Sequence, residues 1–113
     1  MVWSGDLEQD GEKHLLDDVE LPSGVQVWKA GHHGSDTSGS PEWVSRLDPG
    51  LILISCGVEN SYGHPSHGWY LAAGDTISTV RTDLEGSIAL DWDSSGALRW
   101  RTRTRCGQLP ALP

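Results

Sequence analysis

Short apolar runs alternate along the chain with longer segments that have helical character. The apolar runs cover residues 2–4, 25–30, 51–55 and 76–81. The helical segments cover residues 7–19, 41–47 and 66–73. The run at 51–55 is continuously apolar, as in a strand that is buried on both faces. The pattern predicts the order β-α-β-α-β-α-β, and strands that alternate with helices indicate right-handed crossovers and a largely parallel sheet.

Start and stop signals support these helices. In the first, Leu7, Leu15, Leu16 and Val19 have the spacing of an inward face, while acidic residues occupy the outward positions. The second helix has a serine suited to the N-cap followed by proline, and Pro-Gly ends it. A serine also precedes the third, and glycine ends it.

The C-terminal part has the alternating pattern of an antiparallel hairpin. Residues 87–92 and 97–104 alternate around a turn at 93–96, and we expect the hairpin to join the sheet at an edge. Residues 107–113 indicate a frayed end or a linker. The expected organisation is one α/β domain over residues 1–106 followed by this tail.

Charge is distributed unevenly over the 113 residues. The net charge of −8 argues against general nucleic-acid binding by the whole chain. Residues 6–20 hold seven carboxylates, whereas residues 99–105 hold four arginines and no acid. Cys56 and Cys106 match no zinc motif, and Cys56 is expected to be a buried thiol. No signal peptide and no long apolar run is present, so we expect this chain alone neither to be exported nor to span a membrane.

Candidate chemistry follows the ends of the predicted strands. The side chains in question are Asp6 after the first strand, His32 and His33 after the second, and His64 and His67 after the third. Because the carboxyl ends of parallel strands meet at one edge, we expect these groups to converge there. Imidazole and carboxylate ligands together suit zinc, manganese or iron.

Each of these residues also has a structural interpretation. Asp6 suits the cap of the helix that it precedes, and the histidine pair suits an exposed polar loop. His64, between glycine and proline, suits a turn, and His67 suits a solvated helix start. His14 lies among acids on a helix face, and we assign it no role.

The arginines alternate with tryptophan and threonine, so one face of the strand is expected to be all guanidinium. Such a face suits contact with phosphates without reading of bases. The alternative is a charged edge strand that prevents edge-to-edge aggregation. The candidate phosphate contacts are Arg99, Arg101 and Arg103, with Arg105 next in the series.

Four blocks occur in order over residues 2–91: GDLE, HHGS, YGHPS and RTD-x-x-G. With their flanks they resemble the metallo-β-lactamase-like domain of ComEC-type competence proteins, which are bacterial inner-membrane proteins of DNA uptake. The resemblance implies that Asp6 is a metal-bridging ligand and His32 a histidine ligand. It implies that His33 and His64 belong to the same active site, and that the domain is similar to metal-dependent phosphodiesterases and nucleases.

The chain departs from this superfamily in one respect. The early H-x-H-x-D-H or H-x-x-x-D-H segment, which supplies most metal ligands, is missing. The sequence therefore resembles the second half of an αββα sandwich, and we expect the first half to be its partner. Alone, it should bind zinc or manganese incompletely and hydrolyse little.

Two further alternatives remain at this stage. One is a hydrolase of the same fold that acts on a small ester, lactone or phosphodiester. The other is a non-catalytic fragment that self-associates through the apolar surface left by the missing half.

Overall fold

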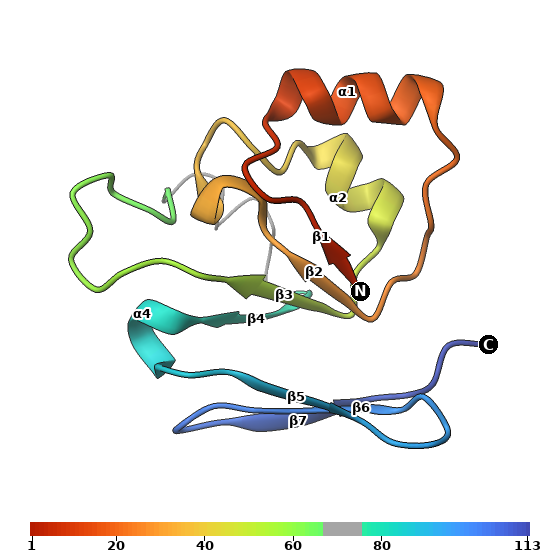
Figure 1. Ribbon diagram of the computed structural model, residues 1–113, viewed down its shortest axis with the longest axis vertical. Coiled ribbons are helices and arrows are strands. Elements are labelled where there is room, and N and C mark those ends of the chain that lie inside the picture. Colours follow the sequence, from red (N-terminus) through yellow and green to blue (C-terminus); the bar gives the residue numbers. More distant parts are fainter. Residues whose placement is uncertain (67–75) are drawn as a thin grey trace.

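Four parallel strands form the centre of the computed structural model, which describes residues 1–66 and 76–113 (Figure 1). The strands are β1 (Val2–Trp3), β2 (Val27–Lys29), β3 (Leu51–Ile54) and β4 (Ser78–Arg81). They pair in the order β1-β2-β3-β4, all parallel, as the alternating pattern predicts. All four residues of β3 are buried, in agreement with its continuous apolar sequence.

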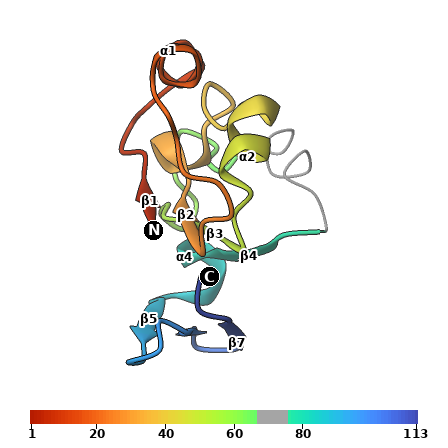
Figure 2. The same ribbon diagram turned by 90° about the vertical axis from the view of Figure 1, so that its right-hand side faces the viewer.

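Two helices, α1 (Gln9–Asp18) and α2 (Pro41–Leu47), lie on one side of this sheet (Figures 1 and 2). Their core contains Trp28 and Ile52 of the sheet together with Trp43 and Leu47 of α2. The α2 helix begins as its signals predict, because the Ser40 hydroxyl accepts a hydrogen bond from the Trp43 amide at 3.3 Å.

The first helix differs from its prediction in bounds and facing. Leu15 and Leu16 pack against the core, but Val19 lies beyond the helix and is 47% exposed. Glu12, an acid of the supposedly solvated face, is instead fully buried. Its carboxylate accepts hydrogen bonds from the amides of Gly39 at 2.6 Å and Ser40 at 2.8 Å. Hydrophobic periodicity cannot predict the burial of Glu12, because this carboxylate is buried where it accepts hydrogen bonds from backbone amides.

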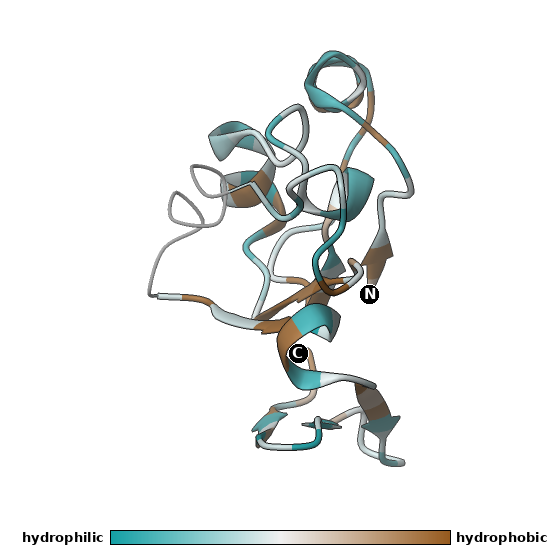
Figure 3. Cartoon of the chain, turned by 90° about the vertical axis from the view of Figure 1, so that its left-hand side faces the viewer, coloured by the Kyte–Doolittle hydropathy of each residue, from teal (hydrophilic) through white to brown (hydrophobic). Residues whose placement is uncertain are grey.

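A second, antiparallel sheet covers the other side of the parallel sheet. It contains β5 (Ala89–Trp92), β6 (Leu98–Arg101) and β7 (Cys106–Leu109), in that order. Leu98 and Trp100 point inward and form a second core with Leu51, Leu53 and other apolar residues of the parallel strands. In Figure 3 the central strands are largely brown, which marks the apolar residues that contribute to these cores.

Two expectations about the C-terminal part are therefore wrong. The hairpin does not extend the parallel sheet at an edge, because its alternating apolar residues need a face to cover. The supposed tail contains β7, whose Gly107 leaves room for the Trp100 ring. A Cβ atom at that glycine would lie 2.5 Å from the ring. The second sheet covers the face of the parallel sheet that lies opposite the helices.

The helix expected at 66–73 falls, from residue 67 onward, outside the described residues. After β4 the chain forms a short helix, α4 (Thr82–Glu85), that the sequence pattern does not reveal. In the described part of the chain, no helix has the length and apolarity needed to cross a membrane.

Glu85 at the end of α4 joins the two sheets. Its carboxylate, 9% exposed, is paired with the Arg105 guanidinium and accepts a hydrogen bond from the Thr102 hydroxyl at 3.0 Å. The same guanidinium donates to the Thr79 carbonyl of β4 at 2.7 Å. The hydrogen bonds from Arg105 hold the pKa of Glu85 below its ordinary value.

We expect Glu85→Gln to destabilise the fold in a pH-dependent manner. The lowered pKa means that the ionised pair contributes its full stability above the unfolded pKa of about 4.5 and loses it as pH falls through the folded value. Denaturant unfolding between pH 7 and pH 3 should show the difference between the wild type and the variant shrinking toward acid. The exposed Glu20→Gln is the control, and a difference independent of pH would contradict this account.

Candidate functional site

The predicted site residues converge at the carboxyl edge of the parallel sheet. Asp6 follows β1, His32 and His33 form the turn η1 (Gly31–Gly34) after β2, and His64 lies in the loop after β3. The His33 Nε2 atom lies 3.7 Å from Asp6 Oδ1. The His32 ring centroid is 6.5 Å from that of His33 and 5.7 Å from that of His64. These distances place the four side chains near one another at this edge.

Both histidines of η1 have left-handed backbone conformations. The φ and ψ angles are 45° and 42° at His32, and 57° and 23° at His33. This region costs a residue with a side chain about 1–2 kcal/mol. Residues held in it cluster at functional sites. The turn uses this conformation to direct two adjacent imidazoles to one edge.

Glycines allow the neighbouring segments to approach this turn. A Cβ atom at Gly31 would lie 2.8 Å from the Leu7 carbonyl oxygen, and one at Gly34 would lie 2.7 Å from Cβ of Pro65. The Ser66 amide also donates to the Gly34 carbonyl at 2.8 Å. The loop that carries His64 is thereby held against η1.

A backbone carbonyl orients the His33 ring. Its Nδ1 atom lies 2.7 Å from the Ser55 carbonyl oxygen, directly after β3. Because a carbonyl only accepts, Nδ1 carries the proton of this hydrogen bond. In the neutral ring, Nε2 then has a free lone pair on the side of Asp6, available for a metal ion or a proton.

Thr82, at the start of α4, fixes the segment that holds this carbonyl. Its hydroxyl accepts from the Cys56 amide at 3.0 Å and donates to the Cys56 carbonyl at 2.8 Å. These two bonds continue the β3–β4 pairing beyond the last ladder pair, Ile54 with Arg81. Thr82 was not among the sequence candidates, although it belongs to the RTD-x-x-G block.

Partial burial and the nearby Asp83 carboxylate both disfavour the thiolate form of Cys56. Burial, followed by the Asp83 carboxylate, raises the pKa of Cys56 to about 11. Hydrogen bonds from Arg81 hold the pKa of Asp83 below its ordinary value. Cys56 is half-buried rather than buried as predicted, and both Cys56 and Cys106 are free thiols.

The His64 loop is held by an asparagine side chain. Asn60 Oδ1 accepts from the His64 amide at 2.9 Å, and Nδ2 donates to the carbonyls of His64 at 2.6 Å and Gly57 at 3.0 Å. The His64–Pro65 peptide bond is cis. Within the described residues, the buried Nδ1 atom of His64 has no hydrogen-bond partner.

Two further charged groups at this edge were not predicted. Glu8 Oε1 lies 2.9 Å from His32 Nδ1, without the alignment of a hydrogen bond. Lys29, at the end of β2, donates to the Ala30 carbonyl at 2.9 Å; burial lowers its pKa, and nearby Asp6 opposes this. Glu8 belongs to the GDLE stretch and Lys29 to the KAGHHGS stretch, so their positions beside the candidate residues could have indicated them. Among residues 1–66 and 76–113, no group of three or more His, Cys, Asp and Glu side chains is arranged to hold a metal ion.

The interpretation of Asp6 as a helix cap is wrong, whereas His14 lies where we expected it. Asp6 does not cap α1, because Glu8 occupies the N-cap position and makes no side-chain cap bond. His14 lies on α1 with its Nδ1 3.2 Å from Asp18 Oδ2, outside the cluster as expected. His67 lies outside the described residues.

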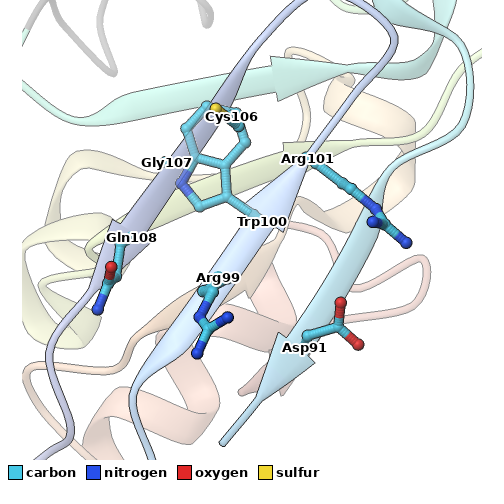
Figure 4. A pocket seen from close by; sticks show the side chains of 7 residues that line it. All are labelled: Asp91, Arg99, Trp100, Arg101, Cys106, Gly107 and Gln108. Carbon is cyan, nitrogen blue, oxygen red and sulfur yellow. The ribbon is translucent and has the colours of Figure 1, made fainter.

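The arginine series does not form one continuous face. Arg99 and Arg101 are exposed on the outer side of β6, beside a hollow of about 470 Å³ (Figure 4). Arg103 lies beyond the strand, and Arg105 turns inward to Glu85. Asp91 pairs directly across from Arg99, which reduces the local positive charge. The edge-strand alternative is wrong, because β6 is the central strand of its sheet.

The fold and the site together define an α/β chain with a histidine and carboxylate cluster at the edge of a parallel sheet. The chain is 33% identical to ComE operon protein 3 of Bacillus subtilis over 116 aligned residues, which cover 100% of this chain and 14% of that protein. It is 32% identical to competence protein ComA of Neisseria gonorrhoeae over 104 residues, which cover 91% of this chain and 15% of that protein. The chain is therefore related to a segment of competence proteins.

These relatives are much longer than this chain, which spans about one seventh of their length. No family model matches the chain. No solved structure matches it.

We expect His33→Gly to be more stable than His33→Ala by about 1 kcal/mol, because only glycine adopts the left-handed conformation without cost. Denaturant unfolding of both variants measures this difference. The control pair is His14→Gly and His14→Ala on α1, where the order should reverse, since glycine destabilises a helix interior by a similar amount. The same order at both positions would contradict the assigned backbone strain.

Thr82→Val should destabilise the fold by about 1–3 kcal/mol, because the Cys56 amide and carbonyl lose their partner. It should also reduce the population of the Nδ1–H tautomer of His33, measured from the imidazole nitrogen shifts by NMR. Thr82→Ser keeps the hydroxyl and should restore both. An unchanged tautomer in a destabilised Thr82→Val protein would show that Thr82 does not act on His33.

Proposed function

We propose that the chain is the C-terminal half of a metallo-β-lactamase-like domain in a ComEC-type competence protein of DNA uptake. The complete domain would be a metal-dependent phosphodiesterase or nuclease. The observation that carries this proposal is the convergence of Asp6, His32, His33 and His64 at one sheet edge. The similarity to two competence proteins supports the biological setting.

The donor types at this edge suit zinc or manganese, which bind imidazole nitrogen and carboxylate oxygen. Asp6 and His32 would be the ligands from this chain, with Glu8 beside His32. The set is incomplete, since the described residues contain no group of three such donors arranged around one point. The remaining ligands would come from a partner half that bears the histidine-aspartate motif.

The bound metal would polarise the phosphate and activate a water molecule. His33, whose Nδ1 is occupied by the Ser55 carbonyl, would accept or donate a proton at Nε2. His64 would donate a hydrogen bond to a phosphate oxygen from the neighbouring loop. Lys29 adds a positive charge to the same edge.

The layer arrangement is compatible with this proposal. The helices, the parallel sheet and the antiparallel sheet would correspond to three of the four layers of an αββα sandwich, and the partner half would supply the rest. The domain would be attached to a bacterial inner-membrane protein. Arg99, Arg101 and Arg103 lie on and beyond the second sheet and would give DNA general affinity rather than take part in chemistry.

The test is the activity of a longer protein in which this segment is joined to the partner half. We expect Zn²⁺- or Mn²⁺-dependent cleavage of DNA, and we expect Asp6→Ala and His32→Ala to lower its rate by a factor of about 100 or more. Gel assays with fluorescent DNA and titration with a chelator measure both effects.

His14→Ala is the matched control, because it removes an exposed imidazole that lies outside the cluster. It should leave the rate unchanged. Full activity in both Asp6→Ala and His32→Ala would show that the ligand assignment is wrong.

A further inference from the structure

A mainly apolar cavity of about 210 Å³ opens beside the histidine cluster. It lies between η1, the end of β3 and the loop that follows. The lining residues are His33, Cys56, Gly57, Asn60, Tyr62 and His64. Its volume is smaller than that of pockets for drug-sized ligands, so it suits a single ring system rather than a whole nucleotide.

Tyr62 presents an aromatic ring at this cavity. Its ring is nearly parallel to that of His64, with an interplanar angle of 17° and centroids 5.8 Å apart. The residue is nevertheless 81% exposed, so its ring is available for a second stacking partner. Because the Asn60 side chain hydrogen-bonds to the backbone of His64, the loop that carries Tyr62 and His64 is held in place.

Apart from the two histidines at its rim, the lining groups Cys56, Gly57 and Asn60 offer little to a charged ligand. The Asn60 side chain is occupied by backbone partners, and the thiol of Cys56, with a pKa of about 11, remains neutral at physiological pH. Among residues 1–66 and 76–113, no Lys or Arg side chain lines the cavity. A neutral, flat group therefore fits the cavity better than a phosphate does.

We propose that this cavity is a stacking subsite for one nucleobase of a single-stranded nucleic acid, with the adjoining phosphate at His33 and His64. The proposal rests on the proposed function, because it needs a nucleic acid at the histidine cluster. Stacking on an aromatic side chain tolerates every base, so the subsite selects for unpaired bases rather than for sequence. A base within a duplex would first have to leave its stack.

The experiment compares two strands with equal numbers of phosphates: a short oligothymidylate and an abasic strand of the same length. Fluorescence anisotropy at low salt, with Mn²⁺ present, measures the Kd of the chain for each. We expect the base-bearing strand to bind about tenfold more tightly, as one stacked base provides. Tyr62→Leu should abolish this preference, and Tyr62→Phe should retain it.

Trp3→Leu is the control for exposed aromatic rings, since Trp3 is 68% exposed on β1 and does not line the cavity. It should leave the preference intact. Equal affinity for the two strands overturns the subsite but leaves phosphate binding, and with it the proposed function, in place. Failure of the chain to bind either strand overturns the subsite, whereas the proposed function is decided separately by DNA cleavage in the longer protein. An equal loss in Trp3→Leu and Tyr62→Leu also overturns the subsite.

Discussion

The burial of β3 on both faces is the constraint on which the rest of the structure depends. Ile52 and Ile54 pack on the helical side, and Leu51 and Leu53 pack against the second sheet. A strand buried in this way has no lateral freedom, so the residues directly after it are placed accurately. Those residues are Ser55, whose carbonyl orients His33, and Cys56, whose backbone is held by Thr82. The end of β3 therefore connects the packing of the core to the geometry of the site.

The cluster itself is built at a local energetic cost. Two consecutive left-handed histidines oppose folding, and they persist because the surrounding contacts specify the turn independently. Glycines on either side allow close approach of the Leu7 carbonyl and of Pro65. The site is thus arranged largely by backbone groups and glycines, while the imidazoles remain available for chemistry.

Much of this arrangement follows from the sequence, and the exceptions have physical causes. Period and length correctly indicate the parallel strands and the edge where Asp6, His33 and His64 lie, because Asp6 and His33 follow strands closely and the loop after β3 carries His64 to the same edge. The predicted position of the second sheet is wrong, because an alternating pattern shows that a strand has an apolar side but not which surface that side packs against. Glu12 and Thr82 act through bonds to distant backbone groups, 27 and 26 residues away. No local pattern encodes such partners.

The contrast between the two cysteines has a practical side. The raised pKa of Cys56 lowers the fraction of reactive thiolate near neutral pH, whereas Cys106 is exposed on the outer sheet. A maleimide dye or spin label would attach selectively at Cys106, at a distance from the histidines. The chain therefore contains an exposed thiol for a probe on the sheet that does not carry the histidines.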